Sequence, residues 1–166
     1  MSFIYIELEA GSFGYPVANP APLDRDVFTN GTKLRQLFDD TIEEFIERTI
    51  PEIPDNIDGA GTVTFIAKGY AKTAAASKNI KLRLGHSAVL AGETFDKAYT
   101  DEDSGDLATD STQDNMDRLT WTETVSNLTW IAGEEIRLQL SRIAPGANNL
   151  VGDYGLTSFT LKIPVT

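Results

Sequence analysis

The sequence EIRLQLSR, residues 135–142, alternates apolar and polar side chains along its length. Successive side chains of an extended strand point to opposite faces, so this pattern predicts a strand with one face in the core and the other in water. The same alternation recurs in four further stretches, namely residues 62–68, 79–86, 118–125 and 158–165. Strands with one apolar and one wet face are typical of antiparallel sheets.

Turn-forming residues separate these stretches. Asn30-Gly31 lies between two short β-prone runs and is the preferred pair for a two-residue hairpin of type I′. About eight strands, with a turn roughly every 8–12 residues, indicate an all-β sandwich or barrel.

Residues 33–50 allow two interpretations. Leu34, Phe38, Ile42 and Phe45 fit one face of a helix. The same segment is rich in β-branched and aromatic residues towards its end, where prolines follow, which favours a strand–turn–strand unit with its turn at residues 39–41. We favour the two strands.

The composition narrows the possible functions. The chain has 166 residues, no cysteine, one histidine and a net charge of −11. These values exclude thiolate metal sites and cysteine nucleophiles, and the negative field disfavours nucleic acid as a partner. No apolar run is long enough to span a membrane, and the first residues do not resemble a signal peptide, so no membrane partner is expected.

Residues 10–23 differ from the rest of the chain, because three prolines and two glycines disfavour a regular ladder there. We therefore divide the chain into an extended N-terminal arm, residues 1–23, and a β-sandwich domain, residues 24–166. Exposed aromatic side chains on such an arm favour contact with another subunit. The candidate partner-binding residues are Phe3, Tyr5, Phe13 and Tyr15. We expect the arm to serve these contacts more than the stability of the sandwich.

Residues 101–117 contain seven acids and no base. Asp101-Glu102-Asp103 begins a run that resembles a calcium loop, but glycine and aspartate stand at its fifth and sixth places, so the calcium pattern fails. We expect an exposed, solvated loop that points away from any partner, and we assign no metal or cofactor.

Other candidate sites have plainer explanations. His86 ends an alternating strand on the apolar side, which indicates a partly buried histidine and not a catalytic one. Adjacent carboxylates such as Glu43-Glu44 and Asp39-Asp40 point to opposite faces of a strand, so they do not define a hydrolase. No catalytic residue is assigned, and the protein is not expected to be an enzyme.

Five aromatic residues are candidates for a sugar-binding face: Tyr70, Tyr99, Trp121, Trp130 and Tyr154. Core packing is nevertheless the default for Trp121, and a rim position suits Trp130.

Three short motifs resemble a pattern found in tailed-bacteriophage virion proteins. The first is FDDTIEE, residues 38–44, which is followed by IPEIPD at 50–55 and GTVTF at 61–65. The two last strands, 135–142 and 155–163, enclose a polar loop and are also similar, so that the resemblance covers about residues 38–165.

This resemblance implies an antiparallel jelly-roll β-sandwich and the role of a head decoration, or cement, protein. Such a protein binds the major capsid protein on the outer capsid surface, stabilises the head and forms homotrimers. The resemblance places the chain in the virion, assembled in the host cytoplasm. The alternative is a receptor- or glycan-binding module of a phage tail or fibre, which an exposed aromatic patch would favour.

Overall fold

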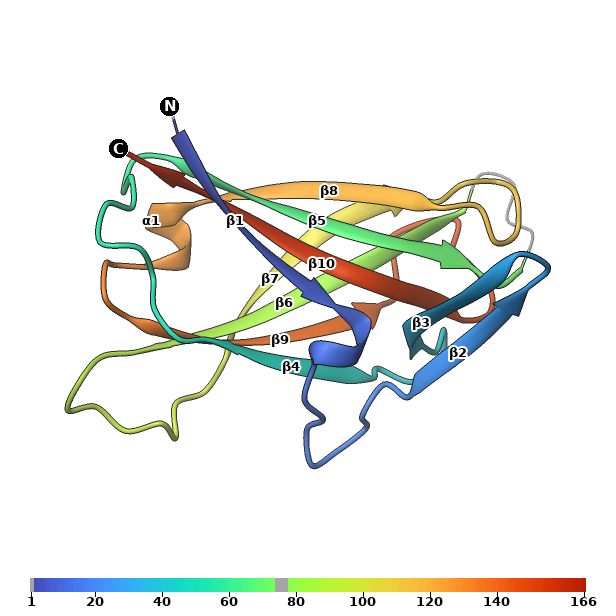
Figure 1. The fold of residues 1–166 in the computed structure, drawn as a ribbon, viewed down its shortest axis with the longest axis horizontal. Helices are drawn as coiled ribbons and strands as arrows, with labels where there is room; N and C mark the ends of the chain where they lie inside the picture. The colour runs from blue at the N-terminus through green and yellow to red at the C-terminus, as the bar shows by residue number, and fades with distance from the viewer. Residues whose placement is uncertain (1, 74–77) are drawn as a thin grey trace.

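Two antiparallel β-sheets make up the computed structural model, which describes residues 2–73 and 78–166 (Figure 1). The first sheet has six strands, in the order β2 (Leu23–Phe28), β3 (Gly31–Phe38), β10 (Tyr154–Val165), β5 (Thr62–Ala71) and β8 (Asp117–Thr124), with β1 (Ser2–Glu9) also paired to β10. The second sheet has four strands, in the order β4 (Phe45–Ile50), β9 (Glu135–Ile143), β6 (Asn79–Val89) and β7 (Thr100–Ala108).

The strand order is that of a jelly roll. If the eight strands from β3 to β10 are counted from one to eight, the first sheet reads 1-8-3-6 and the second reads 2-7-4-5. This order places two Greek keys in a sandwich, the architecture that jelly rolls share. The predicted antiparallel jelly-roll β-sandwich is therefore confirmed, and β1 and β2 are additions at one side of the first sheet.

The core lies between the two sheets and contains a cluster of large aromatic rings. Phe65 stacks on Trp121 at 5.2 Å between ring centroids and on Phe159 at 6.1 Å, while Trp130 meets Phe65 edge-on. Ile136, Leu138 and Leu140 of β9 are buried in the same core, as their alternation predicted. The inward side chains of both sheets thus fix the register of the strands.

Two short helical elements connect strands. The 3-10 turn η1 (Ala10–Ser12) follows β1, and helix α1 (Val125–Leu128) follows β8. Thr124 caps α1, because its side chain accepts a hydrogen bond from the backbone N–H of Asn127 at 3.1 Å. Across the described ranges, no helix is long and apolar enough to cross a membrane.

Residues 33–50 adopt the favoured strand–turn–strand form. Asp39 organises the turn after β3: its Oδ1 accepts hydrogen bonds from the backbone N–H of Thr41 at 2.6 Å and of Ile42 at 3.0 Å. Such a local carboxylate turn competes with helix formation, and this explains why the apolar spacing of the segment does not produce a helix.

A hairpin joins β2 and β3, as Asn30-Gly31 predicted, but its turn lies one residue earlier in the chain. Phe28 pairs with Gly31, so Thr29 and Asn30 form the two-residue turn. Gly31 is the first residue of β3. The prediction of a type I′ turn with Asn30 and Gly31 as its two central residues is therefore wrong.

The N-terminal residues belong to the sandwich, which corrects the expected division into an arm, residues 1–23, and a domain, residues 24–166. Residue 1 lies outside the described residues. From Ser2 to Glu9 every residue of β1 pairs with β10, in an antiparallel register that joins Ser2 to Val165 and Glu9 to Ser158. Backbone pairing to β10 accounts for this placement, because an isolated β10 edge would leave its N–H and C=O groups unpaired.

Residues 13–21 also pack on the domain. Phe13 is buried in the core, and Ala21 is fully buried. The segment runs beside β4: Gly14 and Glu47 exchange two backbone hydrogen bonds of 2.8 and 3.1 Å, and Phe45 bonds Asn19 and Ala21. The prolines prevent a regular strand, yet single backbone bonds between them attach the segment to the second sheet.

The acidic segment 101–117 is mostly exposed, as expected, but its first half is a strand and not a loop, which corrects that part of the expectation. Residues 100–108 form β7, the edge strand beside β6. Cations on β6 lie opposite its acids: Lys81 and Arg83 both contact Asp103, at 2.9 and 2.8 Å. Asp117 is buried at the start of β8. Cross-strand ion pairs therefore offset charges that seemed uncompensated in the sequence.

We expect Phe13→Ala to lower the free energy of unfolding by about 3 kcal/mol, because it leaves a cavity where a buried ring packed. Tyr15→Ala is the matched control, since the Tyr15 ring is half exposed and its loss should cost less than about 1 kcal/mol. Urea denaturation of both variants measures the difference. Equal small losses would show that the N-terminal segment does not support the sandwich.

Candidate functional site

A groove lies on the outer face of the second sheet. Because Ile136, Leu138 and Leu140 point inward, the intervening side chains of β9 point outward. Cross-strand pairing sets them in rows. One row joins Glu47, Gln139, Gly85 and Asp101 across four strands, and the next joins Phe45, Ser141, Arg83 and Asp103.

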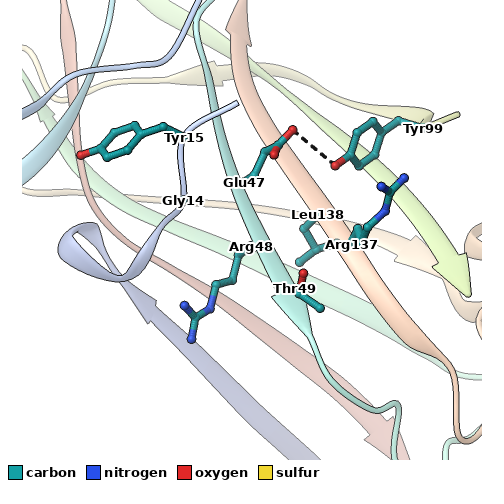
Figure 2. Close-up of a pocket in the computed structure, with 8 residues that line it drawn as sticks. All are labelled: Gly14, Tyr15, Glu47, Arg48, Thr49, Tyr99, Arg137 and Leu138. Atoms are coloured by element: carbon teal, nitrogen blue, oxygen red, sulfur yellow. Dashed lines mark hydrogen bonds between the residues drawn. The ribbon is translucent and has the colours of Figure 1, made fainter. Parts of the chain in front are cut away.

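The groove consists of two hollows that share Tyr99. The first has a volume of about 350 Å³ and is drawn in Figure 2; its lining residues are Gly14, Tyr15, Glu47, Arg48, Thr49, Tyr99, Arg137 and Leu138. The second has a volume of about 270 Å³, and its lining residues are Glu43, Phe45, Arg83, Gly85, Tyr99, Asp101, Gln139 and Ser141. The feature we call the sheet groove comprises these two hollows.

Hydrogen bonds fix the polar floor of the sheet groove. Gln139 donates from Nε2 to Glu47 Oε1 at 2.9 Å, and the Tyr99 hydroxyl donates to the same oxygen at 3.4 Å. In the second hollow, the Ser141 hydroxyl donates to Glu43 Oε1 at 2.8 Å. Because these bonds use one oxygen of each glutamate, the floor is ordered and retains further polar atoms for a ligand.

Tyr99 closes one side of the first hollow. Its ring lies across Gly85, where an added Cβ would come within 3.2 Å of the Tyr99 Cβ. The Arg137 guanidinium lies over the Tyr99 ring, 5.2 Å from its centroid, and donates to the backbone carbonyl of Lys97 at 2.7 Å. Burial, followed by the nearby Glu47 charge, raises the pKa of Tyr99. The hydroxyl therefore stays protonated and remains a donor at neutral pH.

Tyr15 lies at the opposite rim of the first hollow. In Figure 2, Tyr15 and Tyr99 lie on either side of Glu47; the Tyr99 hydroxyl points toward Glu47, whereas the Tyr15 ring points away from it. The two backbone hydrogen bonds between Gly14 and Glu47 hold the Tyr15 segment against β4. About half of the Tyr15 side chain is exposed to solvent. The half-buried Tyr99 ring therefore lies beside the polar floor, and the exposed Tyr15 ring stands at the rim of the groove on a tethered segment.

The second hollow carries a dense group of charges. Arg83 donates from Nε to Asp103 Oδ1 at 2.8 Å, and Asp101 lies 3.7 Å away. The hydrogen bond from Arg83 lowers the pKa of Asp103, and the same bond raises the pKa of Arg83. Glu43 lies 3.9 Å from the same guanidinium. Three carboxylates thus surround one arginine, and this end of the groove is negative.

The structure separates the four candidate partner-binding residues. Tyr15 lines the sheet groove, whereas Phe13 is buried in the core. Phe3 and Tyr5 lie on β1, in the other sheet, where the Lys162 ammonium sits over the Phe3 ring at 3.8 Å. These four residues therefore do not form one surface.

The aromatic candidates for a sugar-binding face also separate. Trp121 is buried, as expected, and Trp130 is buried as well, so the expected rim position is wrong. Tyr70 and Tyr154 are buried. Only Tyr99 of this group lines the groove. Alternation in the sequence does not predict the position of Tyr99, because Tyr99 precedes β7 and lies over a glycine of the neighbouring strand.

His86 and the paired carboxylates have structural partners. The Trp130 indole N–H donates to His86 Nδ1 at 3.4 Å, and His86 is buried, which confirms its assignment as a core residue. Glu44 accepts from the backbone N–H of Asp39, and Asp40 accepts from that of Gly152 at 2.7 Å. Within residues 2–73 and 78–166, no group of three or more His, Asp or Glu is placed to hold a metal ion.

Comparisons with known proteins give only distant structural likenesses. No protein-family profile matches the chain, and no curated protein matches it. Among solved structures, the chain is similar to the xylan-binding module CBM15, with 14% sequence identity, a TM-score of 0.46 and coverage of 98% of this chain and 97% of that chain. The β-sandwich class rests on the sheet order described above, and the resemblance to virion proteins gains no support from these findings.

His86 provides a simple test of the core packing, since it is the only histidine. Burial lowers its pKa, so the unfolded chain takes up a proton near pH 6.5 while the folded chain does not. The free energy of unfolding should therefore decrease as the pH falls below about 6.5, and His86→Gln should reduce that decrease. Titration of the single imidazole by NMR should give a midpoint below 6.5. A midpoint at or above 6.5 would show that the imidazole is solvated.

Proposed function

We propose that the protein is a non-catalytic glycan-binding module and that the sheet groove is its binding site. The observation that carries this proposal is the ordered polar floor of the groove, with the Tyr99 ring beside it and the exposed Tyr15 at its rim. A sugar ring has apolar C–H faces and a rim of hydroxyl groups that both donate and accept hydrogen bonds. Aromatic rings suit the faces, and a mixture of carboxylate, amide and guanidinium groups suits the rim.

The shape of the groove supports an extended ligand. The two hollows share Tyr99 and lie along neighbouring rows of the sheet. Glu47, Gln139 and Ser141 are already oriented by hydrogen bonds to one another or to Glu43, so binding would order few side chains. A pre-organised site loses less entropy when a ligand binds.

Capsid decoration receives less support from the geometry. That role depended on a free arm, whereas β1 pairs along its whole length with β10 and Phe13 is in the core. The major capsid protein as partner, the homotrimer, the virion location and a place on a phage tail or fibre stay predictions from the resemblance. Jelly rolls occur in both capsid and lectin domains, so the fold alone does not choose between them.

We expect Tyr15→Ala to weaken binding of the tightest glycan found on an array by tenfold or more, since it removes the exposed aromatic ring at the rim of the groove. Tyr5→Ala is the matched control, because Tyr5 is an exposed tyrosine on the other sheet, with 61% of its side chain accessible against 52% for Tyr15. Isothermal titration of the wild type and both variants measures the effect.

Equal affinities for the wild type and Tyr15→Ala would contradict the assignment of the groove. A loss with Tyr5→Ala alone would place the site on the outer face of the first sheet. Failure of every array glycan to bind would contradict the proposed function itself.

A further inference from the structure

The charges of the sheet groove are unevenly distributed, and this bears on the kind of glycan it would hold. The second hollow contains Glu43 and Asp101 around Arg83, and Asp103 lies beside them. The first hollow contains two arginines, Arg48 and Arg137, and a single carboxylate. One end of the groove is thus negative and the other positive.

The two arginines of the first hollow are free of acidic partners. Among the described residues, neither Arg48 nor Arg137 forms an ion pair, although most of the other cations on the two sheets do. Glu47 is the carboxylate that lines the same hollow, and its Oε1 accepts from Gln139 and Tyr99 instead. In a chain with a net charge of −11, these two guanidinium groups give the first hollow a local excess of positive charge.

Arg137 is also held ready for an anion. Its Nη2 donates to the Lys97 carbonyl and its plane lies over the Tyr99 ring, so its position is fixed from two directions. Its Nε is buried, so a ligand in the hollow can reach only the terminal nitrogens of this guanidinium. Arg48 lines the same hollow and is tethered by one bond, from Nη1 to the Ser12 carbonyl at 2.7 Å. A fixed guanidinium favours a carboxylate, which it can bind through paired N–H groups.

We propose that the ligand of the sheet groove is a mostly neutral glycan that carries an isolated carboxylate-bearing sugar, and that this carboxylate lies in the first hollow beside Arg137. The inference rests on the proposed function and adds the ligand class. A polyanionic glycan does not suit the groove, because its further carboxylates would meet Glu43 and Asp101 at the other end. Like charges at such close range disfavour binding.

The test uses a glycan array that holds three sets of probes: neutral oligosaccharides, the same backbones with one uronic acid, and polyuronates. We expect the single-acid set to bind best. Isothermal titration then compares the best single-acid oligosaccharide with its methyl ester, which has the same sugars but no charge. Esterification should weaken binding about tenfold, the usual scale of a hydrogen-bonded charged contact.

Variants assign the effect to the arginines. Arg137→Gln should reduce the preference for the acid over its ester to near one, and Arg48→Gln should reduce it in part. Arg118→Gln is the matched control, because Arg118 is an exposed arginine without an acidic partner in the described part of the other sheet, and the preference should persist. If Arg137→Gln does not fold, the ester comparison on the wild type and Arg48→Gln still decides.

The outcomes separate the two proposals. Equal or tighter binding of the neutral set or of the ester overturns the carboxylate inference and leaves the glycan-binding function standing. Tightest binding of polyuronates also overturns the inference, because it contradicts the role of the negative end. An acid preference that survives both Arg48→Gln and Arg137→Gln overturns the placement. No binding of any probe overturns the proposed function and the inference together.

Discussion

The burial of Ile136, Leu138 and Leu140 on β9 is the constraint on which the site depends. These side chains occupy the core beside the aromatic cluster around Phe65, so β9 has one possible register. A shift of one residue would move the leucines into water and turn the polar side chains of β9 into the core. The same packing that stabilises the sandwich therefore directs Arg137, Gln139 and Ser141 into the groove.

Alternation in the sequence was sufficient to predict the sandwich and its main strands, because each strand buries one face. It did not predict β7, since the acids from Asp101 to Asp106 offer no apolar face, and Asp101 and Asp103 have cations on β6 as partners. It also missed the packing of residues 13–21, where backbone bonds to Phe45 and Glu47 act between prolines and glycines. Such pairing depends on residues distant in the sequence, and local patterns carry no signal for it.

The sequence predicted only part of the candidate site, again because the site depends on contacts between residues that are distant in the sequence. Tyr15 and Tyr99 are both aromatic candidates, but they are far apart in the chain and were assigned to different surfaces. The fold places them on either side of Glu47 through two separate contacts: Gly14 bonds Glu47, and Gly85 leaves space for the Tyr99 ring. These two glycines therefore help to form the site, although neither has a side chain that would mark it as a candidate in the sequence. The proposed binding function accordingly depends on geometry that only the folded chain provides.

Mapping a bound glycan on the protein tests the central claim most directly. Backbone amide shifts, followed by NMR while the tightest-binding oligosaccharide is added, report which face the ligand contacts. The account predicts that the largest changes fall on Tyr15, Glu47, Tyr99 and Arg137, and on the row of β9 and β6 beside them. Changes confined to β1, β8 and the outer face of the first sheet would contradict it.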